Sequence, residues 1–360
     1  MARTKERLRE TTTRACNTKD VWTDEYVEQY QRSVLEINLE KWIHIPEIRT
    51  FATHCVPLTL ADAAAFVASY ETFHPEQANH GSAALPPDAQ EAVADAVPDV
   101  ESGAFRVRLE EKVEEGMEAL GGAVFLKTSS RSPKDAAISD GALEAAYAAR
   151  LGDDESLNAK INALLQAGLD VLKVEDAQSG ADLLLRSERI YQDMLMAIKY
   201  PDVFEESIVA REWVDLDTGL EFRGFVKDGV LTALSQYNAL SSFQQVIDAA
   251  AVIPKTIDSF FTSRGIGQAL VEAGMGDVVI DFGLVPRSDP DAESGFDVWV
   301  IELNPFLETT DPALFHWEHD AMDIGNSRKP GPLPVFRYYS SPPSGAKANL
   351  SPEWRRIIDV

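Results

Sequence analysis

The chain has 360 residues, of which 45% are hydrophobic and 26% are charged, and this globular composition excludes a disordered or fibrous protein. Lysine and arginine number 33 against 59 aspartates and glutamates, so the formal net charge is −26 and the isoelectric point is about 4.6. Such a surface repels phosphate backbones, which argues against a nucleic-acid partner and leaves a basic protein or a metal-shielded nucleotide compatible.

The sequence also bears on the compartment. No apolar run approaches the length of about 18 residues that spans a bilayer, so we expect no membrane partner. Cys16 and Cys55 match neither a metal knuckle nor a disulfide framework, which indicates a reducing setting. The first fourteen residues carry five basic side chains without an apolar core, unlike a secretory signal. A transit peptide is the alternative, against which Glu6 and Glu10 argue, and we expect a cytoplasmic protein.

The N-terminal third is predicted to be largely helical. Residues 1–19 are predicted to form a mobile polar tail. Apolar residues recur at steps of three to five from Asp24 to Trp42, which indicates one amphipathic helix or two short ones. Residues 75–101 combine prolines, alanines and acids without a strong apolar face and predict a surface insertion or linker. A helix is expected from Phe105 to Leu120, ended by the pair Gly121-Gly122.

Short apolar runs predict strands through the rest of the chain. Two of them flank Lys227-Asp228-Gly229, and an Asp-Gly step is a strong hairpin signal. Helices are expected at Ser187–Ile198 and within Ser242–Val271. The predicted strands are Ala123–Lys127, Ala181–Leu185, Ile208–Val214, Glu221–Val226, Val230–Ser235, Asp277–Phe282 and Phe296–Leu303.

This order of elements predicts an α+β fold, with antiparallel strand pairs late in the chain. We divide it into an N-terminal lobe at 20–122, a central lobe at 123–215 and a C-terminal lobe at 216–328. The proline-rich segments from Lys329 onward predict an extended tail at 329–360.

The sharpest group of polar residues ends two neighbouring predicted strands. Side chains alternate along a strand, so Glu302 and Asn304 point to the same face, and Asp281 lies beside them if the two strands pair. Two carboxylates and an amide oxygen are hard ligands of the kind that Mg²⁺ bound to a nucleotide requires. A polar strand end that faces water is the alternative.

Two lysines form a second group. Lys127 ends a predicted buried strand, and Lys134 follows in a serine-rich loop. Lysine is a compact point charge suited to phosphates, although single lysines are usually just solvated.

Taken in order, these motifs resemble the cell division cycle protein 123 family, a branch of the ATP-grasp fold. Several separate motifs keep the family's order over roughly residues 105–320, which is more specific than any one of them. The matching stretches are Leu120–Lys127, Ser132–Ala136, Arg211–Trp213, Glu221–Val226, Ser235-Gln236, Ile301–Phe306, Thr310-Asp311 and Leu314–Trp317.

The resemblance implies an ATP-grasp-like fold, in which two α+β lobes, the central and C-terminal ones, enclose a nucleotide cleft behind an N-terminal helical extension. ATP and Mg²⁺ are the implied cofactors, and Asp281, Glu302 and Asn304 match the family's metal ligands, with Glu302 where aspartate is usual. No residue is assigned a catalytic role. The implied ATP-binding residues are Lys127, Ser132 and Lys134 near the phosphates, Arg211, Glu212 and Trp213 in the hinge, and Glu221, Arg223 and Gln236 along the cleft.

Members of this family resemble in function an assembly factor that binds the gamma subunit of eukaryotic translation initiation factor 2. The resemblance implies the same partner here, with a chain that is monomeric when free. A strongly acidic surface suits a basic client. An ATP-grasp ligase that activates a carboxylate as an acyl phosphate is the alternative, since Arg223 suits either role.

Overall fold

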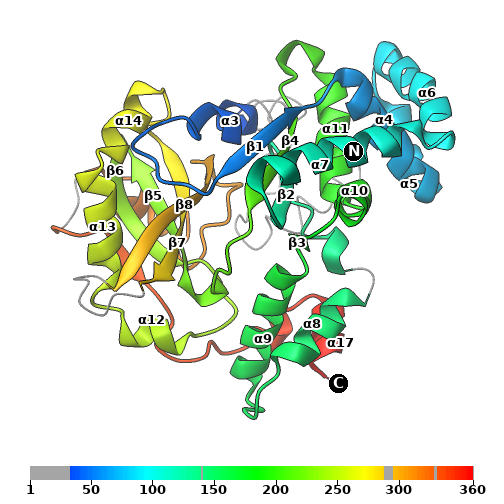
Figure 1. The fold of residues 1–360 in the computed structure, drawn as a ribbon. Coiled ribbons are helices and arrows are strands. Elements are labelled where there is room, and N and C mark those ends of the chain that lie inside the picture. The colour runs from blue at the N-terminus through cyan, green and yellow to red at the C-terminus, as the bar shows by residue number, and fades with distance from the viewer. Residues whose placement is uncertain (1–32, 139–140, 288–294, 328–330, 360) are drawn as a thin grey trace. The chain divides into compact units, whose positions relative to one another are not determined.

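The computed structural model describes residues 33–138, 141–287, 295–327 and 331–359 (Figure 1). The predicted tail at 1–19 lies outside the described residues. The chain divides into two compact units. Unit 1 comprises Met1–Glu40, Ala52–Ala142 and Val171–Trp213, and unit 2 comprises Lys41–Phe51, Leu143–Asp170 and Val214–Val360.

Within the described residues, unit 1 holds a four-stranded antiparallel sheet in the order β1-β4-β2-β3. The strands are β1 (Thr53–Pro57), β2 (Val124–Thr128), β3 (Lys173–Val174) and β4 (Ser207–Glu212), and β2 and β4 confirm two predicted strands. The helices of this unit are α4 (Leu60–Phe73), α5 (Pro75–Ala78), α6 (Pro87–Glu101), α7 (Ala104–Leu120), α10 (Ala177–Leu185) and α11 (Glu188–Lys199), with short 3₁₀ turns η1 (Ser82–Ala84), η2 (Ala136–Ile138) and η3 (Pro201–Val203).

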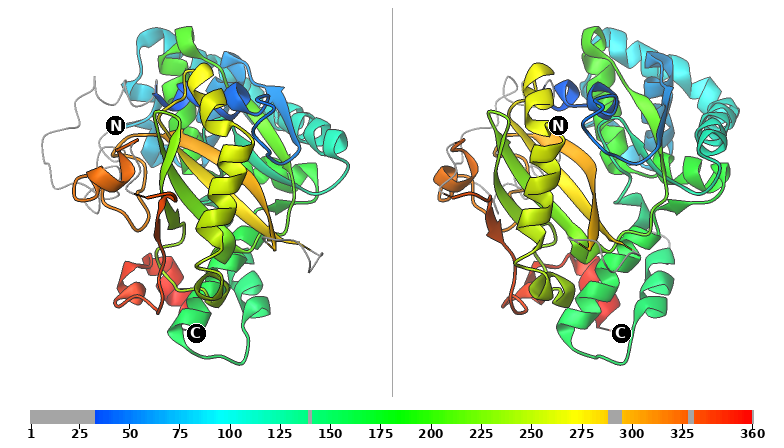
Figure 2. Two further views of the ribbon diagram at one scale, coloured as in Figure 1. Left: turned by 90° about the vertical axis from the view of Figure 1, so that its left-hand side faces the viewer. Right: turned by 60° about the vertical axis from the view of Figure 1, so that its left-hand side comes forward.

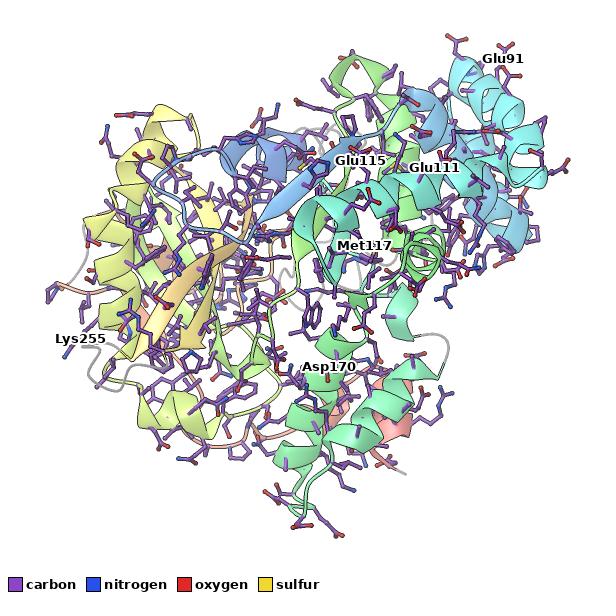
Figure 3. The ribbon with its side chains drawn as sticks, viewed as in Figure 1. Glu91, Glu111, Glu115, Met117, Asp170 and Lys255 are labelled. Carbon is purple, nitrogen blue, oxygen red and sulfur yellow. The ribbon has the colours of Figure 1, made fainter. Side chains whose placement is uncertain are left out.

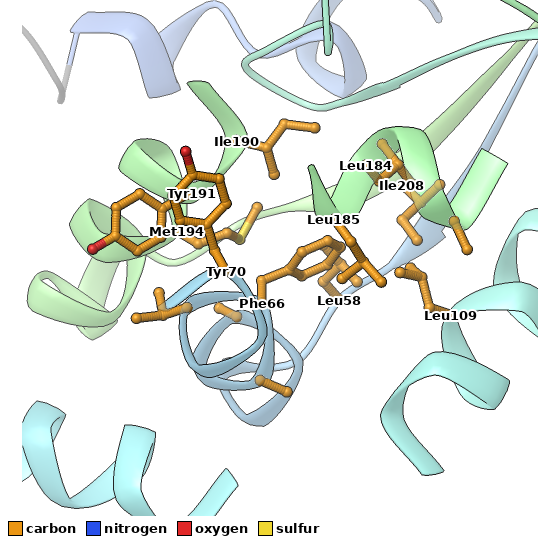
Figure 4. Close-up of a cluster of buried hydrophobic side chains, with 14 of the residues drawn as sticks. Leu58, Phe66, Tyr70, Leu109, Leu184, Leu185, Ile190, Tyr191, Met194 and Ile208 are labelled. Carbon is orange, nitrogen blue, oxygen red and sulfur yellow. The ribbon is translucent and has the colours of Figure 1, made fainter. Parts of the chain in front are cut away.

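The core of unit 1 lies between the sheet and its helices (Figure 4). Phe66 of α4 packs edge-on against Phe105 of α7, and Tyr70 stacks on Tyr191 of α11 with ring centroids 4.4 Å apart. Leu126 of β2 joins this cluster from the sheet. The apolar faces of several amphipathic helices are therefore buried together against one side of the sheet.

Local signals place several of these helices as predicted. Gly121 ends α7 with φ +73°, a left-handed conformation that glycine adopts without a steric penalty. Ser187 caps α11 by accepting a hydrogen bond from the backbone N–H of Ile190. In the described part of the first predicted helix, residues 33–36 are helical and α3 (Leu39–Trp42) follows after a break, which matches the expectation of two short helices.

Two predictions for unit 1 are corrected by the structure. Ala181–Leu185, predicted as a strand, lies in helix α10, which Asp176 caps through the N–H of Ser179. A short apolar run fits a buried strand and a buried helix equally well, so its period could not decide. Residues 75–101 form α5, η1 and α6 rather than a linker, and Ala89 and Val93 of α6 enter the core.

Unit 2 holds a second sheet, with five strands in the order β8-β7-β5-β6-β9 among the described residues. The predicted hairpin is confirmed, and both Asp228 (φ +50°) and Gly229 (φ +71°) adopt the left-handed conformation that a tight two-residue turn needs. The strands are β5 (Glu221–Lys227), β6 (Val230–Gln236), β7 (Val278–Pro286), β8 (Phe296–Pro305) and β9 (Val335–Arg337), and β9 alone among them runs parallel to its neighbour.

Helices lie along one face of this sheet (Figure 2). The predicted helical stretch Ser242–Val271 is three helices, α12 (Gln244–Asp248), α13 (Ile253–Ser263) and α14 (Ile266–Glu272), with Gly265 at φ +71° between the last two. On the other face, Phe225 and Val279 pack with the loop residues Phe315 and Trp317. The remaining elements of unit 2 are α8 (Ala142–Arg150), α9 (Leu157–Asp170), η4 (Thr218–Leu220), α15 (Ala321–Ile324), α16 (Ala346–Asn349) and α17 (Pro352–Ile358).

The C-terminal segment, predicted as an extended tail at 329–360, is integrated into unit 2 where it is described. β9 extends the sheet, and Leu350, Ile357 and Ile358 are buried. The division into lobes also differs from the predicted one. No unit boundary falls at 122/123, because α7 packs in the same unit as β2, and residues 143–170 belong to unit 2. The lobe boundary predicted between residues 215 and 216 lies close to the observed boundary, where the chain passes from unit 1 to unit 2 after Trp213.

The surface reflects the acidic composition. Glu91 on α6 and Glu111 and Glu115 on α7 are exposed on the outer sides of their helices (Figure 3). Glu115 also contacts His54 Nε2 of β1 at 3.2 Å, and all three carboxylates add to the negative field around the protein.

Candidate functional site

The predicted metal ligands meet on two neighbouring strands of unit 2. β7 and β8 are antiparallel, with Asp281 paired to Glu302 and Val279 paired to Asn304. A bulge between Asp281 and Phe282 shifts the register, so that Ile301 is the extra residue on β8. Asn304 Nδ2 donates to Asp281 Oδ2 at 3.0 Å. The predicted pairing of the two strands, which brings Asp281 beside Glu302 and Asn304, is confirmed.

Asp281 also forms a buried ion pair that the sequence did not predict. Arg223 on β5 lies opposite Asp281 in the sheet register, and its Nε and Nη2 atoms donate to Oδ1 and Oδ2, each at 2.8 Å. Asp281 is 4% exposed and Arg223 is 5% exposed. Burial alone lowers the pKa of the Arg223 guanidinium, but the charge and hydrogen bonds of Asp281 outweigh it, so the pKa is raised and the arginine stays charged.

Two further contacts hold the Arg223 guanidinium. Nη1 donates to the backbone oxygen of Asp311 at 2.6 Å, and the guanidinium carbon lies 4.8 Å from the centre of the Tyr237 ring. Ala313 has φ +53°, and its N–H donates to the Asp311 carboxylate, so this loop has a defined shape. Arg223 thus connects β5, β7 and the loop that follows β8.

Two residues predicted to contact ATP lie at strand ends. Gln236 is the last residue of β6, and Glu221 is the first residue of β5. Gln236 is fully buried, with Nε2 donating to the carbonyl oxygens of Asn238 and Ser241 and Oε1 accepting from the N–H of Tyr339. Its amide therefore organises the end of β6 in this structure. Glu221 is partly exposed at the start of β5, two residues from Arg223.

The remaining predicted residues belong to unit 1. Lys127 on β2, Val209 on β4 and Cys55 on β1 lie side by side across the sheet. Lys127 is 4% exposed, and alternation puts Arg211, which is also buried, on the same face. Burial, followed by the charge of Glu40, raises the pKa of Cys55 to about 11, so its thiol is protonated and unreactive.

The other members of this predicted set lie at the ends of the unit 1 strands. Glu212 Oε1 accepts from the N–H of Ala52, and Trp213 N–H donates to Ala123 O, where the chain leaves unit 1. Ser132 is partly exposed and Lys134 is exposed. The neighbouring Asp135 anchors their loop by accepting from Ser187 Oγ at 2.7 Å.

Three acidic residues surround the loop after β2, and the sequence carried no signal for them. Ser129 Oγ donates to Glu40 at 2.5 Å, and Ser130 Oγ donates to Asp193 at 2.5 Å. Arg131 Nε donates to Asp193 at 3.1 Å. Glu40 and Asp193 are on helices α3 and α11, far from β2 in the sequence, so only the fold brings them together.

Glu206, just before β4, is the third of these acids. It is 5% exposed, and within the described parts of the chain its Oε2 atom has no hydrogen-bond partner. Burial first, then the charges of Asp193 and Glu40, raise the pKa of Glu206 well above its ordinary value. The protonated form of Glu206 is therefore favoured next to the loop that carries Ser132 and Lys134.

The side chains on β7 and β8 include oxygen atoms of the kind that magnesium binds. Asp281, Glu302 and Asn304 offer oxygen ligands, and because the amide nitrogen of Asn304 faces Asp281, its oxygen is turned away from that carboxylate. Among the described residues, no group of three or more histidine, cysteine, aspartate or glutamate side chains is placed to hold a metal ion, and the β7 and β8 set itself has two carboxylates and one amide. In the same parts of the chain, every helix is too short or too polar to cross a bilayer.

Comparison with known proteins places this α+β fold. The structure of Cdc123 from Schizosaccharomyces pombe matches with a TM-score of 0.53 at 19% identity, covering 85% of this chain and 96% of that one. The fold is thus that of Cdc123. The D123 family model matches residues 170–351, half of the chain, and this protein belongs to the D123 family.

Curated relatives agree with this assignment. The "Translation initiation factor eIF2 assembly protein" of Xenopus tropicalis is 27% identical over 249 residues, which cover 64% of this chain and 60% of that protein. The protein of the same name in Danio rerio is 29% identical over 216 residues, covering 58% and 50%. "Cell division cycle protein 123" of Candida glabrata is 32% identical over 114 residues, covering 31% and 28%. The chain thus spans at most about 60% of the length of these relatives.

Proposed function

We propose that this protein is an ATP- and magnesium-dependent assembly factor for translation initiation factor 2, acting in the cytoplasm through the factor's gamma subunit. Membership of the D123 family carries the proposal, together with relatives whose names state eIF2 assembly. The net charge of −26 supports a basic client, since complementary charge speeds encounter and selects partners.

Magnesium nucleotide binding is the second part of the proposal. Asp281, Glu302 and Asn304 would hold the metal, which when bound neutralises phosphate charge. By family resemblance, Lys127 and Lys134 would contact the phosphates as point charges. The same resemblance assigns Ser132, Arg211, Glu212, Trp213, Glu221, Arg223 and Gln236 to the nucleotide.

Magnesium and ATP together are expected to raise the melting temperature more than either alone, because ligands that bind only the folded state stabilise it by mass action. Asn304→Ala should remove most of the joint shift, since it deletes an oxygen donor. The exposed Asn79 provides the control, and Asn79→Ala should keep the full shift. Differential scanning fluorimetry measures both. Equal shifts with and without magnesium would refute the metal site.

Lys127→Ala is expected to weaken ATP binding by about 1 to 3 kcal/mol, the scale of a charge-assisted contact. Titration calorimetry measures this directly. Lys112 of the same unit is the matched control, because its ammonium lies 3.9 Å from Asp62 and donates to the carbonyl oxygen of Pro57. A Lys127→Ala protein that loses stability yet binds ATP normally when folded would show that this lysine is scaffolding.

A third experiment distinguishes an assembly factor from a ligase. Immobilised protein should capture the gamma subunit of the initiation factor, capture should be lost on Asn304→Ala, and ADP release without client should stay near the detection limit. A ligase would release ADP only when a carboxylic acid and an amine are supplied together, because the acyl phosphate forms on the acid. Robust substrate-dependent ADP release without capture of the gamma subunit would favour the ligase.

A further inference from the structure

We propose that Arg223 is a built-in counter-cation of the metal site, which neutralises Asp281 while the site is empty and thereby sets how strongly the site takes up a divalent cation. The proposal rests on the magnesium site described above. It adds a residue whose role is to compete with the metal and to keep the empty site folded.

The geometry of the Asp281 carboxylate carries this inference. Both of its oxygens accept from Arg223 at 2.8 Å, and Oδ2 also accepts from Asn304 at 3.0 Å. Three of roughly four acceptor positions on a carboxylate are then in use. A divalent cation that takes Asp281 as a ligand has to share this carboxylate with the guanidinium or replace it.

Burial explains why a counter-cation is needed. The side chains of Arg223 and Asp281 are each 6% exposed. An unpaired carboxylate at this depth is strongly unfavourable, so a protein without metal requires another positive charge. Arg223 supplies it in planar, two-point geometry that lysine cannot reproduce.

The other contacts of Arg223 suit exchange. Its Nη1 bond to the Asp311 carbonyl and its contact with the Tyr237 ring do not involve Asp281. The guanidinium therefore keeps partners of its own when the carboxylate is shared. Because Asp311 lies in the loop after β8, metal uptake is coupled through Arg223 to that loop.

The test removes the guanidinium and asks whether magnesium replaces it. Arg223→Met should melt well below the wild type in EDTA. Magnesium chloride at about 100-fold its Kd should then raise the melting temperature of this variant by about 5 °C or more, whereas the wild type should shift much less without ATP. Sodium chloride at matched ionic strength should not reproduce the effect.

Two further variants complete the experiment. Arg49→Met is the matched control. Arg49 pairs with Asp297 on β8, which keeps Arg287 as a partner, so this variant should show the same small magnesium shift as the wild type. Arg223→Lys retains the positive charge but has a single donor group. Magnesium should raise its melting temperature by at least twice the shift of the wild type. This variant keeps the test available if Arg223→Met does not fold.

The outcomes separate the two proposals. Absence of a magnesium gain in both Arg223 variants, while wild type binds magnesium ATP in an Asn304-dependent way, would overturn the role of Arg223 and leave the proposed function intact. Absence of any response to magnesium or magnesium ATP in the wild type and variants would overturn both.

Discussion

Asp281→Ala is expected to lower the free energy of unfolding by about 3 to 5 kcal/mol in the absence of metal. The substitution leaves the guanidinium of Arg223, which is 5% exposed, without its carboxylate in a site that water does not reach freely. Removing one partner of a buried pair costs far more than the pair itself contributes, since the remaining charge is uncompensated. Urea denaturation in EDTA, with the m-value checked for constancy, measures the loss.

The charge pair can be dissected by a double variant. Asp281→Asn combined with Arg223→Met removes both charges and should recover most of the loss, because apolar or neutral groups of similar volume replace buried pairs at little cost. Asp297→Ala is the exposed comparison, since its side chain is 31% exposed and its arginines remain solvated, and it should cost at most about 1 kcal/mol. If Asp281→Ala and Asp297→Ala lost the same amount of stability, Asp281 would not be effectively buried.

Glu206→Gln is expected to stabilise the protein, increasingly so as the pH rises. The folded-state pKa of Glu206 lies well above its ordinary value of 4.5, so in the folded protein the carboxyl keeps its proton over a range in which the unfolded chain has lost it. Over that range the folded state binds more protons, and the stability of the wild type falls with pH by about 1.4 kcal/mol per unit from this group. The decline begins near 4.5 and ends at the folded-state pKa.

The amide variant removes this decline because it is neutral at every pH. The free energy of unfolding should be measured by denaturation at several pH values between 5 and 9. It should change less with pH in Glu206→Gln than in the wild type, and the difference between the two proteins should be smallest at the acidic end. Glu205→Gln, at the adjacent and exposed position, is the control, and its stability should change with pH in parallel with that of the wild type. Parallel curves for Glu206→Gln would mean that the carboxyl is ionised in the folded protein despite its burial.

Local chemistry was enough to predict part of this fold. The Asp228-Gly229 step determined a hairpin because both residues adopt positive φ, and Gly121 ended α7 for the same stereochemical reason. β7 and β8 follow one another in the chain with one loop between them, so strand alternation sufficed to bring Asp281 beside Glu302 and Asn304. The core of the candidate metal site was therefore predictable from the sequence.

Predictions failed where a segment is defined by what it packs against. Ala181–Leu185 is an apolar run without a decisive period, and its helical state follows from the Asp176 cap and from burial against the unit 1 sheet. Residues 75–101 show a weak apolar face, yet two buried side chains, Ala89 and Val93, join them to the core. The C-terminal segment is ordered because β9 pairs with β6, about a hundred residues earlier.

The sequence by itself thus determined the acidic surface, the family's motifs and the elements whose ends depend on neighbouring residues. The tertiary structure alone decided which charges meet. Arg223 reaches Asp281 because β5 pairs with β7, although three helices and a strand separate the two in the chain. The pKa of Glu206 is raised because the side chain is buried and because helices α11 and α3 bring Asp193 and Glu40 near it. Both the Arg223–Asp281 ion pair and the raised pKa of Glu206 depend on burial and on residues that are distant in the sequence. Burial favours paired charges and neutral acids over isolated charges, and local residue patterns do not show which side chains will be buried together.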